Sequence, residues 1–228
     1  MIDALVATGS LPLVDGEPQV PDDFYWAFEE RMRGDPSVVR ERLATYEGLA
    51  RDLVADVATD GSRRPRWLDL GCGRGELCVL LRDWGWEVEG VDRSPAAAEA
   101  CRRQGIDVSV ADVFAFLEAG PVAEPDAVSA IQLIEHLPRA RWPELFAAAF
   151  EVLRPGGALL VETINGQNLR ALADHFFADL THTWPGHPQT LRLLAERAGF
   201  THVDVRFEHP DARGNAEDVA IWARKPMA

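Results

Sequence analysis

The sequence predicts an α/β protein built on a doubly wound, mostly parallel sheet of seven strands. Two observations support this prediction. From Arg66 to the end of the chain, short apolar runs alternate with segments that have helical apolar periodicity. Glycines such as Gly85 and Gly105 end the helical segments, so each strand is followed by a helix and then by the next strand. This alternation is typical of a parallel sheet that helices cover on both faces.

The expected elements follow one another along the chain. Strands are expected at residues 67–70, 88–92, 107–111, 127–134, 158–164, 202–208 and 218–225. Helices are expected at residues 75–85, 95–105, 113–120, 142–157 and 188–200. The long stretch at residues 165–187 shows no periodicity. Because long irregular stretches in compact domains usually have a function, we expect it to cover a binding site.

The part of the chain before the alternating pattern has a different character. Residues 1–20, rich in Gly and Pro, read as a loose arm. Two helices are then expected, over residues 24–34 and 37–57. We therefore divide the chain into an N-terminal arm with helices, residues 1–60, and a ligand-binding domain, residues 61–228.

Charge and composition exclude several classes of protein. Lys and Arg total 23 against 37 Asp and Glu, so the formal net charge is −14, a poor match for nucleic acid or an anionic membrane. No apolar run approaches the ~18 residues of a membrane span, and the N-terminus lacks the features of a secretory signal. The three cysteines form no C-x-x-C pair, so neither a disulfide framework nor a thiolate zinc site is expected. We expect a soluble cytoplasmic protein whose oligomeric state the sequence leaves open.

The turn after the first predicted strand is the expected ligand site, because open α/β sheets bind ligands beyond the carboxyl ends of their strands. It reads D-L-G-C-G-R-G-E from Asp69 to Glu76, and its glycines allow a sharp turn and close approach of a ligand. Glu76 stands where a dinucleotide fingerprint has its third glycine, and a carboxylate there would repel a pyrophosphate. We expect a ligand with an amino-acid-like end.

Acidic residues follow the next two strands. Asp92 ends the second strand and can accept hydrogen bonds from ribose hydroxyls. Asp112 follows the third strand and can accept one from an adenine amino group, with Val113 and Arg93 against the ring faces. The alternative for each aspartate is a helix N-cap.

These motifs resemble those of class I S-adenosylmethionine-dependent methyltransferases. LDLGCGRGE, VEGVD and LRPGG are similar to three of their conserved segments, and the resemblance covers about residues 66–228. It implies a Rossmann-like methyltransferase fold, S-adenosylmethionine as cofactor and S-adenosylhomocysteine as product. It places Asp69, Gly71 and Gly73 at the methionine end and Gln132 near the sulfonium.

Three further segments, DDFYWAFEERMRG, ETINGQN and DLTHTWPGHPQTLRLLAERAGF, resemble bacterial methyltransferases associated with polysaccharide and sugar biosynthesis. This resemblance implies a hydroxyl of a sugar or glycan as acceptor, and an N-terminal helical lid with Tyr25, Phe28 and Arg33 near the cofactor. Arg33 is a candidate for the cofactor carboxylate, because guanidinium groups pair well with carboxylates. The alternative for Arg33 is a solvated helix face.

The chemistry is expected at the end of the fourth strand. There His136 is a candidate general base, with Glu135 orienting it or the substrate, because a neutral imidazole accepts protons near pH 7. The alternative is that Glu135 caps the start of a helix and His136 packs against the core. Small-RNA 2′-O-methyltransferases and ubiquinone-pathway O-methyltransferases have E-x-x-E-H at this place and bind a divalent cation. This chain has Gln132 in place of the first glutamate, which weakens such a site. We therefore expect no metal, and keep as the alternative a cation held by Glu135 and His136, with His182 completing the set.

Three functions remain open at this point. The leading one is methylation of a sugar or glycan hydroxyl, and residues 165–187 offer Asn165, Asn168 and Trp184 to contact a polyhydroxylated ring. The second is methylation of another small molecule of secondary metabolism. The third is a catalytically silent domain that binds the cofactor, against which the presence of Glu135 and His136 argues.

Overall fold

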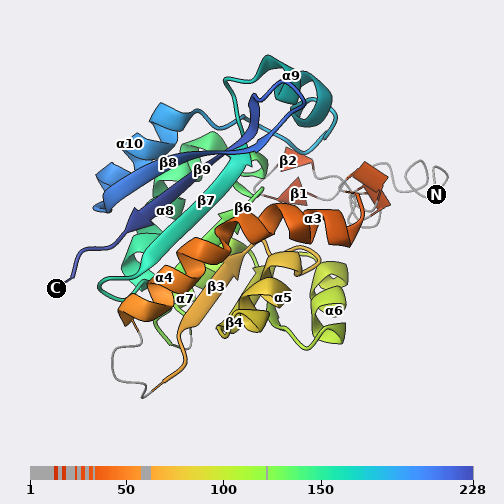
Figure 1. Cartoon of the computed structure of the whole chain (residues 1–228). Coiled ribbons are helices and arrows are strands. Elements are labelled where there is room, and N and C mark those ends of the chain that lie inside the picture. The colour runs from red at the N-terminus through yellow and green to blue at the C-terminus, as the bar shows by residue number, and fades with distance from the viewer. Residues whose placement is uncertain are drawn as a thin grey trace.

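Figure 1 shows a computed structural model of the chain. The structure describes residues 13–14, 17–18, 24, 27–28, 31–32, 34–57, 63–121 and 123–227.

The centre of the fold is a seven-stranded sheet with the order β5-β4-β3-β6-β7-β9-β8. Its strands are β3 (Arg66–Leu70), β4 (Glu87–Asp92), β5 (Asp107–Val110), β6 (Ala127–Ile131), β7 (Ala158–Ile164), β8 (Thr201–Pro210) and β9 (Ala216–Arg224). All neighbouring strands pair in parallel except β9, which is antiparallel to both β7 and β8. The strand order reverses between β3 and β6, and this switch point is where ligands bind in such folds. The predicted fold class is confirmed.

Helices cover both faces of the sheet (Figure 1). They are α3 (Pro36–Leu43), η1 (Ala44–Tyr46), α4 (Glu47–Val57), α5 (Glu76–Asp83), α6 (Pro95–Arg103), α7 (Val113–Ala119), α8 (Trp142–Val152) and α10 (Pro188–Ala198). On one face α3, η1, α4 and α5 share a core with the sheet, in which Tyr46 and Leu53 pack near Trp67 and Leu160. On the other face α7, α8 and α10 pack around residues such as Phe146. The helices that precede the alternating pattern therefore share a core with the sheet, while the predicted domain boundary stays a prediction.

The fourth predicted strand ends earlier than expected, and this difference shapes the candidate site. β6 stops at Ile131 because Gln132 has a φ of 49°, which turns the chain out of the sheet. The backbone N–H of Gln132 still donates to the Glu162 carbonyl (2.9 Å). A short 3₁₀ turn, η2 (Ile134–His136), follows.

Other differences are smaller. The arm expected over residues 1–20 contains a short antiparallel pair, β1 (Leu13–Val14) with β2 (Glu17–Pro18). The helix expected over residues 37–57 is interrupted by η1. The stretch expected to be irregular contains α9 (Leu169–Ala171) and a π-helical turn, η4 (Leu172–Phe176), and the chain also has the 3₁₀ turn η3 (Arg139–Arg141). In the described part of the chain, no helix combines the length and apolar character needed to cross a membrane.

Candidate functional site

The glycine turn after β3 has the conformation and the close packing that only glycine allows. Gly71, Gly73 and Gly75 have φ values of 68°, 52° and 82°, a region that disfavours residues with a Cβ. A Cβ on Gly71 would lie 2.8 Å from Cδ1 of Leu133, in the segment that follows β6. The glycine turn therefore packs directly against the segment that follows β6, and we call the turn from Gly71 to Gly75 the glycine cradle.

Two predicted cofactor residues brace this turn. Asp92 accepts hydrogen bonds from the backbone N–H groups of Gly73 (2.9 Å) and Ser94 (2.8 Å), so it links the end of β4 to the turn. Asp69 is buried and accepts from the Ser129 hydroxyl (2.5 Å), across the β3–β6 pair. The structure places Asp69 near the end of β3 and Asp92 at the end of β4, against the turn, and their roles toward methionine and ribose stay predictions.

The third carboxylate of the set caps a helix. One oxygen of Asp112 accepts from the backbone N–H groups of Phe114 (3.0 Å) and Ala115 (3.1 Å) at the start of α7, so the capping alternative is confirmed. Val113 is buried in the core beneath it and Arg93 is exposed. The contacts of Asp112, Val113 and Arg93 with adenine stay predictions.

The predicted lid residues are mostly outside the described structure. Tyr25 and Arg33 lie outside the described residues, so their predicted contacts with the cofactor stay predictions. Phe28 is helical and half-buried.

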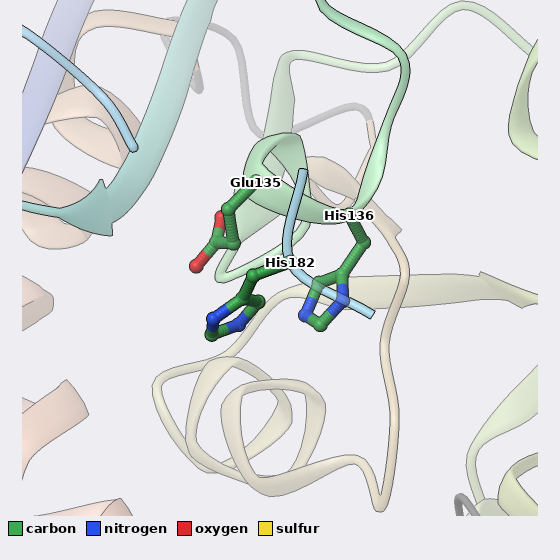
Figure 2. Close-up of side chains that lie close together, drawn as sticks. All are labelled: Glu135, His136 and His182. Carbon is green, nitrogen blue, oxygen red and sulfur yellow. The ribbon is translucent and has the colours of Figure 1, made fainter. Parts of the chain in front are cut away.

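The three predicted catalytic residues come together at the carboxyl end of the sheet (Figure 2). Glu135 and His136 lie on η2, directly after the switch point, while His182 comes from the segment after η4. Each offers an atom that can bind a metal, and these three atoms lie within 4.8 Å of one another. Residues far apart in the sequence thus form a set of one carboxylate and two imidazoles.

Glu135 is the buried member of this set. Its Oε2 accepts a hydrogen bond from the Thr163 hydroxyl (2.8 Å), whereas Oε1 is buried and has no hydrogen-bond partner in the described part of the chain. Burial raises the pKa of Glu135 to about 8. A buried oxygen without a partner is unfavourable, so this position favours a proton or a cation beside Glu135.

Protein oxygens orient both imidazoles. Nδ1 of His182 lies 2.8 Å from the Phe176 carbonyl, which only accepts, so Nδ1 carries the proton. The Thr181 hydroxyl donates to Asp179 (2.7 Å), so it accepts from Nδ1 of His136 (2.8 Å). In the neutral form each ring therefore presents a lone pair on Nε2. This is the arrangement of metal-binding histidines, and it also suits a general base.

Residues 165–187 hold this site in place in a way that sequence reasoning missed. Thr181 and Asp179 orient His136, whereas Asn165 and Asn168 both donate to the Ala216 carbonyl, at 3.1 Å and 3.0 Å. The two asparagines thus tie the segment to the β8–β9 hairpin. Trp184 is half exposed.

A cavity of about 570 Å³ opens beside these asparagines, between the start of the segment and the hairpin. Its walls include Gln167, Arg170 and Phe207 but none of the three catalytic candidates. It is therefore separate from the cluster of Glu135, His136 and His182, and the geometry of the cluster is the stronger guide to the chemistry.

A second polar group, which the sequence did not reveal, lies on the other side of Gln132. The Gln132 side-chain amide donates to Glu162 (3.3 Å) and Asp218 (2.9 Å). His209 lies 3.1 Å from Glu162, and the Tyr46 hydroxyl also donates to that carboxylate. Arg42 pairs with Asp218 at 2.6 Å. We call this group the Gln132 network; its members are Gln132, Glu162, Asp218, His209, Tyr46 and Arg42.

The charged groups of the Gln132 network shift one another's pKa values. Burial alone would raise the pKa of Glu162 and lower that of His209, but their mutual hydrogen bond and opposite charges outweigh burial. The pKa of Glu162 therefore lies below its usual range and that of His209 above it. Burial, with the charge of Glu162, raises the pKa of Asp218 to about 6. When His209 is protonated, its charge and that of Arg42 oppose the charges of the two carboxylates.

We expect the substitution His209→Gln to destabilise the protein more at pH 6 than at pH 9. Because the folded-state pKa of His209 is raised, its contribution is full below the unfolded value and is lost as the pH rises through the folded one. Urea unfolding at both pH values measures this. His202→Gln is the control, because His202 is exposed on the same strand with a similar φ of 49°. Equal destabilisation by His209→Gln at both pH values would contradict the ion pair.

Comparison with known proteins agrees with this architecture. Residues 40–205 match a family model described as a methyltransferase domain. A ubiquinone biosynthesis O-methyltransferase of Alkalilimnicola ehrlichii is 29% identical over 196 residues, which cover 84% of this chain and 71% of that protein. One from Xylella fastidiosa is 31% identical over 196 residues, covering 83% of this chain and 70% of that protein.

A solved structure shows the same relationship. A SAM-dependent methyltransferase from Archaeoglobus fulgidus, where SAM is S-adenosylmethionine, has a TM-score of 0.78 at 27% identity, covering 89% of this chain and 100% of that chain. The glycine cradle suits a ligand that approaches the backbone closely. The chain belongs to the methyltransferase domain family and is an enzyme that uses SAM as its cofactor.

Proposed function

We propose that this enzyme transfers the methyl group of SAM to a hydroxyl oxygen of a small molecule, and that Glu135, His136 and His182 hold a divalent cation beside the acceptor. The observation that carries the proposal is the cluster of these three residues, whose ligand-capable atoms lie within 4.8 Å of one another. The cluster favours the metal-dependent alternative over the metal-free reaction expected from the sequence.

The donor set fits a divalent cation. One carboxylate with two imidazoles is a common set for cations such as Mn²⁺, Fe²⁺ and Zn²⁺. Oε1 of Glu135, which has no hydrogen-bond partner among the described residues, and the Nε2 lone pairs of the histidines would serve as ligand atoms. Gln132 is not part of the set, and its amide nitrogen is engaged by two carboxylates.

The residues of the site have separate roles in the proposed reaction. SAM, when bound, supplies an electrophilic methyl group on a positively charged sulfur, and the cation would favour the ionised form of the acceptor hydroxyl. Nε2 of His136 would face the cation, because Thr181 and Asp179 hold the proton of the ring on Nδ1, and the hydroxyl proton would leave to solvent. The glycine cradle holds the donor at the switch point, so that donor and acceptor meet beside η2.

The acceptor class has support from two sides. The relatives named ubiquinone biosynthesis O-methyltransferases favour a phenolic hydroxyl. The resemblance of residues 162–168 and 179–200 to sugar-associated methyltransferases favours a sugar hydroxyl. The described asparagines of that segment are bonded to backbone, so we place the phenolic acceptor first.

A second candidate is the same transfer without a metal, with His136 as general base and a sugar hydroxyl as acceptor. The chain of hydrogen bonds from Asp179 through Thr181 to His136 favours it, because a carboxylate at the end of such a chain stabilises a protonated imidazole.

The experiment that separates these candidates measures methyl transfer from labelled SAM after EDTA treatment. Catechol, a nucleotide sugar and a primary amine serve as acceptors, each with and without added Mn²⁺. We expect transfer to catechol only when Mn²⁺ is present. Full activity after EDTA treatment would support the metal-free reaction, and transfer to the amine alone would contradict O-methylation.

A further inference from the structure

Gln132 occupies a special position at the switch point. It is the first residue after β6, and its φ of 49° is unusual for a residue with a side chain. The next residue, Leu133, packs against Gly71, so Gln132 lies close to the glycine cradle. Backbone strain of this kind persists where surrounding contacts hold it, often at functional sites.

The side-chain amide of Gln132 has a defined orientation. Its nitrogen lies 3.3 Å from Oε1 of Glu162 and 2.9 Å from Oδ1 of Asp218. Carboxylates only accept hydrogen bonds, so the two amide protons point at them. The carbonyl oxygen of Gln132, on the other branch of the same planar group, therefore points away from both carboxylates.

The two carboxylates are themselves held firmly. Glu162 and Asp218 are buried, Tyr46 and His209 bond to Glu162, and Arg42 pairs with Asp218 at 2.6 Å. Glu162, His209 and Asp218 lie close enough to hold a cation. However, Arg42 already pairs with Asp218, and Tyr46, His209 and Gln132 already bond to Glu162, so this group serves as a support and not as a metal site.

We propose that Glu162 and Asp218 are positioning residues that direct the carbonyl oxygen of Gln132 toward the sulfonium of SAM. This interaction lets the enzyme distinguish the charged donor from its neutral product, S-adenosylhomocysteine (SAH). A carbonyl oxygen attracts a sulfonium cation, and two carboxylates at the amide nitrogen strengthen the negative end of the dipole. After transfer the sulfur is neutral, the attraction is lost, and release of the product is favoured.

The network also accounts for glutamine at this position. A glutamate at 132 would bring a third carboxylate against Glu162 and Asp218 in a buried setting, which is strongly unfavourable. The neutral amide donates to both carboxylates and still offers one oxygen to the cofactor.

The test is calorimetric titration of SAM and SAH into the full chain, which needs neither an acceptor nor a metal. The measured quantity is the ratio of the SAH Kd to the SAM Kd. We expect Gln132→Met, which keeps the length but lacks the oxygen, to lower this ratio about tenfold, because losing a polar contact with a charged group costs at least about that factor. Glu162→Gln and Asp218→Asn should lower it severalfold, and Glu162→Gln should have no further effect in the Gln132→Met background.

Glu208→Gln is the matched control. Glu208 bonds to Thr45 and Arg206 on the same side of the sheet, whereas the Gln132 amide bonds to Glu162 and Asp218, so the ratio should not change. If the Glu162 and Asp218 variants weaken SAM and SAH by the same factor, the network is only structural and the proposal is wrong. If Gln132→Met does not fold, the other two variants decide. Because only cofactor binding is measured, failure of the proposed acceptor or metal leaves the test intact.

Discussion

Replacing Glu135 with alanine is expected to abolish Mn²⁺ binding and to lower kcat roughly a thousandfold, the size of effect expected when several kcal/mol of transition-state stabilisation are lost. Glu135 is the only carboxylate in the candidate set with His136 and His182. Without it, the set keeps two imidazoles and has no carboxylate ligand for a divalent cation. The Thr163 hydroxyl also loses its acceptor.

Titration with Mn²⁺ measures the loss of cation binding, and the labelled-methyl assay measures the fall in kcat. A second variant separates the effect of the charge from that of the shape. Glu135→Gln keeps the shape and can still accept from Thr163, but it removes the charge, so it should also lose cation binding. Glu118→Ala is the control, because Glu118 is an exposed carboxylate on α7. Unchanged Mn²⁺ affinity in both Glu135 variants would show that the cation, if bound, is held elsewhere.

The substitution Gly71→Ala is expected to weaken SAM binding by a factor of about a hundred or more. The new Cβ would lie 2.8 Å from Leu133 Cδ1, and the residue would have a φ of 68°, which disfavours residues other than glycine by about 1–2 kcal/mol. The turn would have to move away from Leu133, and the cradle beside it would change shape. Calorimetric titration with SAM measures the loss.

Two companion variants separate the causes. Leu133→Ala in the Gly71→Ala background removes the clash but not the strain, so affinity should recover in part. Gly85→Ala introduces a similar strain, at a φ of 98°, where no atom lies within 4 Å of the new Cβ. It should reduce stability and leave SAM affinity unchanged. Normal SAM affinity in Gly71→Ala would mean that the turn does not contact the cofactor.

Much of the fold could be predicted because local patterns of apolar residues and glycines determine where strands, turns and helices form. The strand before the glycine turn, the turn itself and α5 follow directly from the apolar run and the glycines between Asp69 and Glu76. The end of β6 could not be predicted, because Val128, Ile131 and Leu133 continue the same apolar pattern. Only the pairing with β7 and the turn at Gln132 end the strand.

Some residues of the candidate site could also be predicted from the sequence, and others could not. Glu135 and His136 are adjacent in the chain, so their side-chain types and their place after the fourth strand are enough to make them candidates. That His182 joins them depends on the path of the chain through η4, where the Phe176 carbonyl orients its ring. The Gln132 network could not be predicted at all, because single side chains join α3, η1, three strands and the residue after β6.

The sequence by itself therefore determined the order of strands and helices, the glycine turn and the chemical types of the catalytic candidates. These depend on periodicity and on backbone preferences that act over a few neighbouring residues. Only the tertiary structure decided which protons the histidines carry, that one oxygen of Glu135 lacks a partner in the described part of the chain, and that Gln132 lies between two buried carboxylates. Those properties arise from burial and from hydrogen bonds between distant segments. A local sequence pattern predicts neither of these.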